Sequence, residues 1–246
     1  MNIIEHIGKY TALVLQALQP AEKKRVYYQQ IIYEMYELGI KSIPFVAFVS
    51  IFVGAILALQ TSANIKNPLI PKYLVGFATR ESIMMEFSPT IISLLLAGKV
   101  GSNIASEIGS KRVTEQIDAL EIMGINSAGY LIFPKIVALM VINPFIICLS
   151  ILIGVTGGWI AALTTGSTTS VQFIEGIQWD YNMMKFSYAM VKTVLFAFFI
   201  ATVPAYYGYF TSGGSLGIGK SSTKAVVNTS LLIIFFNLII TNMFLN

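Results

Sequence analysis

Long apolar stretches, most of them without a charged residue, dominate the hydrophobic pattern of the chain. A charged side chain at the centre of a membrane helix costs about 2.5–3.5 kcal/mol on insertion scales, so such stretches mark segments that can lie in hydrocarbon. Each approaches or exceeds the roughly 20 residues that a helix needs to cross a bilayer. They cover residues 42–65, 73–101, 136–174, 193–219 and 225–246. The pattern predicts an all-α, polytopic membrane protein with five transmembrane helices.

The third stretch is too long for one crossing, and the turn-forming residues 164–170 interrupt it. Before the first stretch, an apolar stripe of helical spacing precedes Pro20 and the basic residues 23–25. The stripe consists of Ile3, Ile7, Val14 and Leu18. Residues 1–41 are therefore expected to form an N-terminal interfacial segment on the inner leaflet. Packing of this helix on the protein's own bundle is an equal alternative. Residues 42–246 are expected to form the transmembrane domain.

The distribution of Lys and Arg predicts the orientation. Five spans place the termini on opposite sides of the membrane. With the N-terminus in the cytoplasm, eleven of the sixteen Lys and Arg residues fall on the inner side and five near the outer side. Cytoplasmic loops carry the excess of basic residues, so we expect a cytoplasmic N-terminus and a C-terminus on the outer side.

Composition excludes several other classes. Hydrophobic residues make up 55% and charged residues 11% of the chain, against about 45–50% and about 25% in an average soluble domain. The net charge of +4 comes from thinly spread basic residues, which argues against nucleic-acid binding. One cysteine, Cys148, and one histidine leave no thiol, metal or triad chemistry. We therefore expect no metal, no cofactor and no enzymatic activity in this chain.

Small residues recur every fourth position in two neighbouring rows. The first row is Ala97, Gly101, Ala105 and Gly109, and the second is Gly98, Ser102, Ser106 and Ser110. On one helix face they allow a second helix to approach closely. The partner helix belongs either to the same chain or to a second copy of it. A weaker row occupies the third span, at Gly154, Gly158, Ala162 and Gly166.

Glu86 lies near the middle of the second stretch, with Pro89 one turn later. An ionisable residue at this depth is costly, and it marks a wet cavity or a polar ligand unless it is paired. Pro89 lacks a backbone N–H and is expected to kink the helix. Together they suggest a cavity with an acidic wall. The alternative is an ion pair of Glu86 with Arg80 or Lys192.

Residues 114–124 predict a short amphipathic helix in a cytoplasmic loop. Thr114 suits its N-cap, Glu115 and Asp118 suit its first turn, and Gly124 suits its C-terminal end. The expected apolar stripe beside an acidic face consists of Val113, Ile117, Leu120 and Met123. Such a helix, roughly 13 Å long, cannot span the membrane, and its acids disfavour contact with the negative inner leaflet. It is suited to binding a soluble partner.

Residues 214–221 match the P-loop pattern G-x-x-x-x-G-K-[ST]. That pattern binds phosphate only where it joins a buried strand to a helix. Here an aromatic-rich membrane stretch precedes it. We predict a flexible inner connector, and ATP hydrolysis by another chain.

Residues 96–102, 107–109 and 112–124 read Leu-Ala-Gly-Lys-Val-Gly-Ser, Glu-Ile-Gly and Arg-Val-Thr-Glu-Gln-Ile-Asp-Ala-Leu-Glu-Ile-Met-Gly. This sequence closely resembles the MlaE family of ABC transporter permeases, which move phospholipids across the envelope of Gram-negative bacteria. The resemblance implies a homodimer in the bacterial inner membrane. It also implies an ABC ATPase subunit that binds ATP and Mg²⁺, and a periplasmic lipid-binding protein of the MCE type.

The resemblance also implies roles for particular residues. The coupling helix that contacts the ATPase maps onto Glu115, Gln116, Asp118, Ala119, Leu120, Met123 and Gly124. The lipid cavity maps onto Glu86, Pro89 and Gln60. Met85 and Ser88 depart from the arginine and glycine common in the family, and Ile125-Asn126-Ser127 replaces the usual Val-Asp-Pro. The competing functions are an ion-coupled carrier with Glu86 as its proton site and a membrane scaffold without transport.

Overall fold

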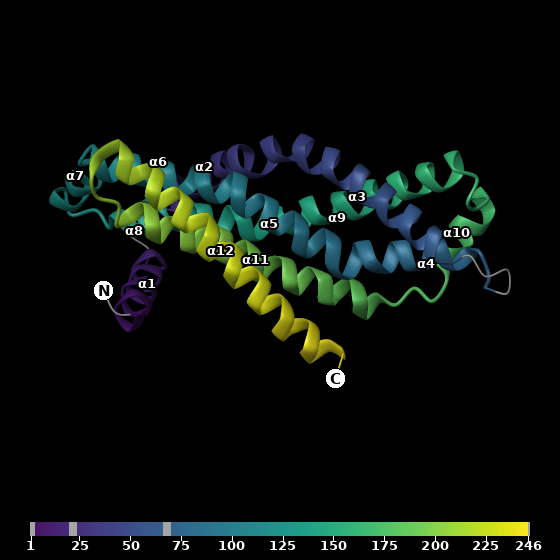
Figure 1. Cartoon of the computed structure of the whole chain (residues 1–246). Helices are drawn as coiled ribbons and strands as arrows, with labels where there is room; N and C mark the ends of the chain where they lie inside the picture. Colours follow the sequence, from purple (N-terminus) through teal and green to yellow (C-terminus); the bar gives the residue numbers. More distant parts are fainter. Residues whose placement is uncertain (1–2, 20–23, 66–69, 246) are drawn as a thin grey trace. The chain divides into compact units, whose positions relative to one another are not determined.

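The computed structural model describes residues 3–19, 24–65 and 70–245. Pro20, Lys23 and Lys66 lie outside the described residues. Within these ranges the chain forms helices and no strand (Figure 1), which confirms the all-α class. Five helical stretches are long and apolar enough to cross a membrane, as predicted. They are Tyr27–Asn64, Tyr73–Val113, Ser127–Thr164, Met183–Tyr209 and Gly214–Phe244.

The chain divides into two compact units. The first comprises Met1–Lys41, Ser93–Asn143 and Val194–Asn246, and the second comprises Ser42–Ile92 and Pro144–Thr193. Two long helices, α9 (Phe133–Thr164) and α11 (Met183–Tyr209), contribute residues to both units.

The other helices of the first unit include two π-helical segments, η1 and η4, in which the backbone turns are wider than in an α-helix. In chain order the elements are α1 (Ile3–Ala17), α2 (Lys24–Glu34), η1 (Met35–Gly39), η2 (Ile40–Ser42), α5 (Ser93–Leu96), η4 (Ala97–Gly101), α6 (Ser102–Val113), α7 (Gln116–Ile122), α8 (Ser127–Leu131) and α12 (Gly214–Leu245). The 3₁₀ turn η2 ends at the first residue of the second unit.

The first small-residue row is used inside the chain. Ala97 and Ala105 are fully buried. A Cβ added to Gly101 would lie 3.1 Å from Pro204 Cγ in α11, and one added to Gly109 would lie 3.2 Å from Thr211 Oγ1. The row is therefore a close packing surface within the chain. In the second row, a Cβ on Gly98 would meet nothing within 4 Å, and Ser102 accepts a backbone hydrogen bond from Ser222 Oγ at 3.3 Å.

The structure differs from the prediction at residues 214–221, which were expected to form a flexible connector. That expectation is wrong, because these residues form the beginning of α12. The chain turns at the start of α12, where Gly213 and Gly214 have φ angles of +92° and +68°. Ile218 lies 3.6 Å from the position of a Cβ on Gly109, so packing against α6 outweighs the low helix propensity of the glycines. The fourth span accordingly ends at Tyr209.

Helix α1 combines the two alternatives for the N-terminal segment. Leu13 and Ala17 are buried, and α1 packs beside α8 (Figure 1). The apolar side chains of Ile4, Ile7 and Leu15 are exposed. One side of the helix therefore packs on its own unit, while the other offers an apolar surface of the kind that enters a membrane interface.

The second unit is built on close contacts between helix backbones. Its remaining elements are α3 (Ile43–Asn64), α4 (Tyr73–Ser82), η3 (Ile83–Ile92) and α10 (Ser170–Gln178). A Cβ on Gly54 would lie 1.8 Å from the carbonyl oxygen of Gly154, and one on Gly176 would lie 1.9 Å from that of Tyr73. The weaker row that begins at Gly154 therefore packs on α3. The predicted break follows it, where Gly166 has a φ of +65° and Thr169 caps α10.

Gly54→Ala is expected to lower the free energy of unfolding by about 1–3 kcal/mol or more, because the added methyl group pushes α3 away from α9. Gly98→Ala is the matched control, since its methyl group enters open space and alanine favours helix by up to about 1 kcal/mol. Unfolding of the purified variants by SDS titration in mixed micelles measures both. Equal unfolding midpoints for the two variants would contradict the assignment.

Candidate functional site

Glu86 and Pro89 lie in η3, a π-helical segment of ten residues. Proline removes one backbone hydrogen bond and its ring clashes with the preceding turn of an α-helix. Pro89 is buried, and the wider π-turns around it replace regular α-helix. The predicted distortion is thus present as a change of helix type. Short π-helical segments occur frequently at functional sites.

Glu86 forms an ion pair with Lys192, which was one of the two expected partners. Glu86 Oε1 lies 2.9 Å from Lys192 Nζ, and Thr90 Oγ1 donates to Glu86 Oε2 at 3.4 Å. Lys192 is fully buried and also donates to the carbonyl oxygen of Met85 at 3.2 Å. The Glu86 side chain is 39% exposed. The carboxylate therefore balances a buried ammonium group while part of its side chain is exposed.

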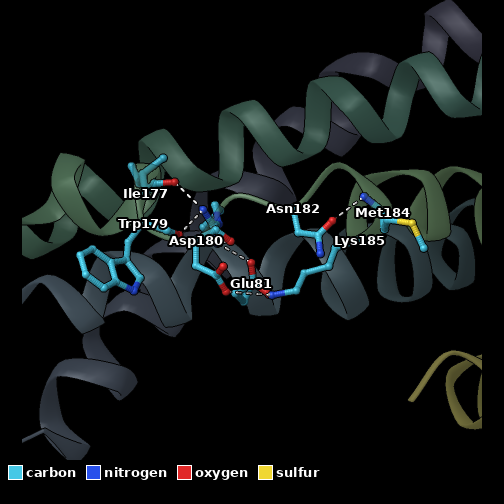
Figure 2. A network of polar contacts seen from close by, with 8 residues as sticks. Glu81, Ile177, Trp179, Asp180, Asn182, Met184 and Lys185 are labelled. Atoms are coloured by element: carbon cyan, nitrogen blue, oxygen red, sulfur yellow. Dashed lines mark hydrogen bonds and ion pairs between the residues drawn. The ribbon is translucent and has the colours of Figure 1, made fainter. Parts of the chain in front are cut away.

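Arg80, the other expected partner, binds elsewhere (Figure 2). Its guanidinium donates to the carbonyl oxygens of Ile177 at 2.6 Å and Trp179 at 3.0 Å, and it pairs with Glu81. Lys185 Nζ lies 2.8 Å from the second oxygen of Glu81. These contacts attach α4, which carries Arg80 and Glu81, to the end of α10 and to the turn after α10.

This network was not found from the sequence. Its acceptors are backbone carbonyl groups about 100 residues away from Arg80, and side-chain type carries no signal for them. The ion pair of Arg80 with Glu81 was not predictable from their adjacent positions, because adjacent helical residues do not normally face each other. The turn itself includes Asp180, which has a φ of +48°.

The residues expected to line the lipid cavity differ in their exposure. Gln60 is exposed on α3, whereas Pro89 is buried. A hollow of about 10 Å³ in the second unit is lined by Ser50, Ser88 and Ser150, among others, but not by Gln60, Glu86 or Pro89. It is about the size of one water molecule. The three residues of the lipid cavity remain a prediction.

The short helix expected at residues 114–124 is present as α7, but its N-terminal end differs from the expectation. Thr114 is not its N-cap, because α6 continues to Val113 and Thr114 ends that helix, donating from Oγ1 to Ser110 O at 2.9 Å. Glu115 takes the N-cap position with a φ of 59° and without a side-chain cap bond. A left-handed residue reverses the chain after a helix, and glycine is usual there. Glu115 therefore holds a strained backbone conformation.

The C-terminal end of α7 agrees with the prediction. Gly124 has a φ of +75° and donates to Glu121 O, while Ile125 N–H donates to Leu120 O at 3.0 Å. These two bonds form a Schellman motif. Asn126 then caps α8 through Gly129 N–H and donates to Gln16 O in α1 at 2.8 Å. The departure from Val-Asp-Pro thus starts a new helix.

One face of α7 is fastened to the first unit. Ile117 is completely buried. Asp118 Oδ1 accepts a hydrogen bond from Arg112 at 2.6 Å, and Glu121 Oε1 accepts one from Tyr209 at 2.8 Å and one from Ser127 at 2.9 Å. Two of the three acidic side chains are thus engaged by the chain itself.

The exposed surface of α7 carries apolar side chains as well as acidic ones. Ile122 is 87% exposed and Met123 is 65% exposed. We call the exposed set the outer face of α7; it comprises Glu115, Gln116, Ala119, Glu121, Ile122 and Met123. Leu120 is half-buried beside it. The acids Glu115 and Glu121 are exposed on the same helix, and Ile122, which lies outside the expected apolar stripe, is its most exposed apolar residue.

Comparison with known proteins decides the family. The sequence model described as Permease MlaE matches residues 31–243. The chain belongs to the MlaE permease family. A protein of Rickettsia bellii named probable ABC transporter permease protein is 33% identical, over 99% of this chain and 94% of its own length. This MlaE-family chain is a multi-pass membrane protein.

Two further relatives are more distant. The intermembrane phospholipid transport system permease protein MlaE of Haemophilus influenzae is 26% identical, over 98% of this chain and 92% of that protein. The chloroplastic protein TRIGALACTOSYLDIACYLGLYCEROL 1 of Arabidopsis thaliana is 24% identical, over 90% of this chain and 63% of that protein. The resemblance seen in residues 96–124 is thus confirmed across nearly the whole of this MlaE-family permease.

Proposed function

We propose that this chain is the permease subunit of an ATP-driven ABC transporter that moves phospholipids between the inner and outer membranes of a bacterial envelope. The observation that carries the proposal is α7: a short helix fixed on one face by Ile117, Asp118 and Glu121, with exposed Ile122 and Met123 on the other. A rigid helix with an exposed apolar face can transmit the movement of a bound protein.

The names of the relatives support this proposal. The protein from Rickettsia bellii is named an ABC transporter permease, and the one from Haemophilus influenzae is named for phospholipid transport. The exposed apolar side chains of Ile122 and Met123 suit the centre of an interface, because the centres of protein interfaces are depleted in charge. The strained φ of Glu115 beside this face adds support, since such strain concentrates at functional sites.

The proposed complex contains a second copy of this chain, an ABC ATPase subunit and a periplasmic lipid-binding protein of the MCE type. The ATPase subunit binds ATP and Mg²⁺ and contacts the outer face of α7. The chain itself spans the bacterial inner membrane, with its N-terminus in the cytoplasm and its C-terminus in the periplasm. Glu86, Pro89 and Gln60 line the lipid cavity that the two copies form.

Replacement of Ile122 by aspartate tests the contact with the ATPase. We expect Ile122→Asp to reduce the ATPase that co-purifies with the permease by at least tenfold, roughly, because a buried charge at an interface centre costs about 2 kcal/mol or more. The thermal unfolding of the permease in detergent should not change, since Ile122 is exposed.

The matched control is Val171→Asp on α10, where the apolar side chain is also exposed. This variant should retain the ATPase fully. Normal recovery of the ATPase with Ile122→Asp would refute the role of α7. Transport by the permease alone in liposomes, driven by a proton gradient, would instead favour an ion-coupled carrier.

A further inference from the structure

A hollow of about 440 Å³ lies in the first unit, between α1, the end of α11 and the beginning of α12. Its lining includes Lys9, Lys220, Lys224, Tyr206, Tyr207 and Ser221. An adjoining hollow of about 530 Å³ shares Lys220 and Lys224 and adds the hydroxyl group of Ser215. Lysine ammonium and hydroxyl groups are donors that suit an anion with several oxygen atoms.

The charge of these hollows is not balanced by the part of the chain that the structure describes. Among their lining residues there is no aspartate or glutamate. Within the described ranges, Lys220 and Lys224 have no carboxylate at ion-pair distance, and both are exposed. Lys9 pairs with Glu5 at 2.9 Å, with both side chains near half exposure. Such an exposed pair contributes little and leaves the surface positive.

Two hydrogen bonds from α1 hold the walls of the 440 Å³ hollow in place. Tyr10 OH lies 2.7 Å from Thr202 Oγ1, and His6 Nδ1 lies 2.7 Å from Tyr206 OH. Burial raises the pKa of the Tyr10 phenol, so this hydroxyl keeps its proton at neutral pH. Both bonds join α1 to α11 and so fix two sides of the 440 Å³ hollow.

Apolar side chains on the same elements distinguish a lipid from a soluble anion. Ile4 and Ile7 are exposed on α1, the helix that supplies Lys9. Leu216, which lines the adjoining hollow, is also exposed on α12. Basic residues near apolar surface are the arrangement in which helices bind anionic lipid at a membrane interface.

The sequence at Lys220 and Ser221 matches the end of the P-loop pattern, yet no strand precedes it, and its glycines lie inside α12. It therefore lacks the backbone loop that surrounds the phosphates of a nucleotide. We infer that the lysine hollows bind the phosphate group of an anionic phospholipid, with the acyl chains against the apolar side chains of α1 and α12. This site is separate from Glu86 and does not depend on the proposed transport function.

Native mass spectrometry of the purified full-length protein in micelles tests this inference, with phosphatidylglycerol and phosphatidylcholine added in equal amounts. The wild type is expected to retain phosphatidylglycerol preferentially. In the double variant Lys220→Gln and Lys224→Gln this preference should fall by roughly tenfold. Each basic residue near an anionic lipid surface raises the binding constant by about tenfold or less. Both side chains are exposed, so elution on gel filtration should not change.

Lys72→Gln is the control variant, since it removes one exposed lysine from the second unit and should leave the lipid preference unchanged. A second arm adds inorganic phosphate at millimolar concentration. Full displacement of the lipid preference by phosphate would show that the hollows take a free anion and would overturn the assignment to lipid. An unchanged preference in the double variant would overturn the site itself.

Discussion

Replacement of Lys135 by methionine is expected to lower the free energy of unfolding by about 3–5 kcal/mol. The Lys135 side chain is 1% exposed, and its Nζ lies 2.6 Å from Glu34 Oε1 and 2.7 Å from Glu107 Oε2. Methionine fills a similar volume but leaves Glu34 without its ammonium partner and leaves Glu107 with Lys111 alone. Removal of one member of a buried ion pair is costly because the remaining charge stays buried. SDS titration followed by circular dichroism measures the change.

Lys111→Met provides the matched control for Lys135→Met. Lys111 Nζ lies 2.7 Å from the other oxygen of the same Glu107, but its side chain is 31% exposed. An exposed pair of this kind contributes about 0–1 kcal/mol, since water solvates both charges once they separate. Equal losses in the two variants would show that burial of Lys135 does not determine its contribution.

Lys135 also bears on the proposed contact with the ATPase. Glu107 lies on α6, which continues directly into the turn at Glu115 and then into α7. Lys135 joins α6 to α9 and to α2 through its two carboxylate partners. The base of the helix that carries α7 is therefore held from two sides, as a helix that transmits movement requires.

The five spans follow from the sequence because length and apolar character decide whether a helix can cross a bilayer. The boundary between the fourth and fifth spans did not follow. Residues 214–219 contain three glycines, and local propensity favours a loop there. Packing of Ile218 near Gly109 in α6 decides for helix, and that contact joins residues about 100 positions apart.

The position of α7 was predictable from the sequence, but the hydrogen-bond partners of its acidic side chains were not. Gly124 marks the end of the helix by local chemistry alone. Glu121 accepts a hydrogen bond from Tyr209, which is 88 residues away in the chain. A sequence pattern shows which side chains share a helix face, but the partner on that face comes from the tertiary fold.

Two basic residues, Arg80 and Lys192, were the candidates from the sequence for the ion-pair partner of Glu86. Helix geometry gave a further signal, because residues six positions apart do not share a face of an α-helix as those three or four apart do. That spacing disfavours Arg80. The close contact with Lys192 on α11 is a tertiary contact across 106 residues.

Glu86→Lys is expected to reduce phospholipid transport by at least tenfold, roughly the factor that corresponds to 1.4 kcal/mol. The new ammonium group faces Lys192, which is fully buried, so two like charges oppose each other where an ion pair stood. The free energy of unfolding should also fall, by about 3 kcal/mol or less. Breaking a fully buried ion pair costs about 3–5 kcal/mol, but Glu86 is partly exposed and water reduces the loss. Transport is measured with the permease and its ATPase reconstituted in liposomes.

The double variant Glu86→Lys and Lys192→Glu separates the structural role of Glu86 from a role toward lipid. The exchange restores opposite charges across the same 2.9 Å contact, so most of the lost stability should return. If the exposed part of Glu86 contacts the lipid, transport should stay low, because an ammonium group now occupies the position open to the ligand. Recovery of both stability and transport would show instead that Glu86 serves only to balance Lys192, and it would remove Glu86 from the proposed lipid cavity.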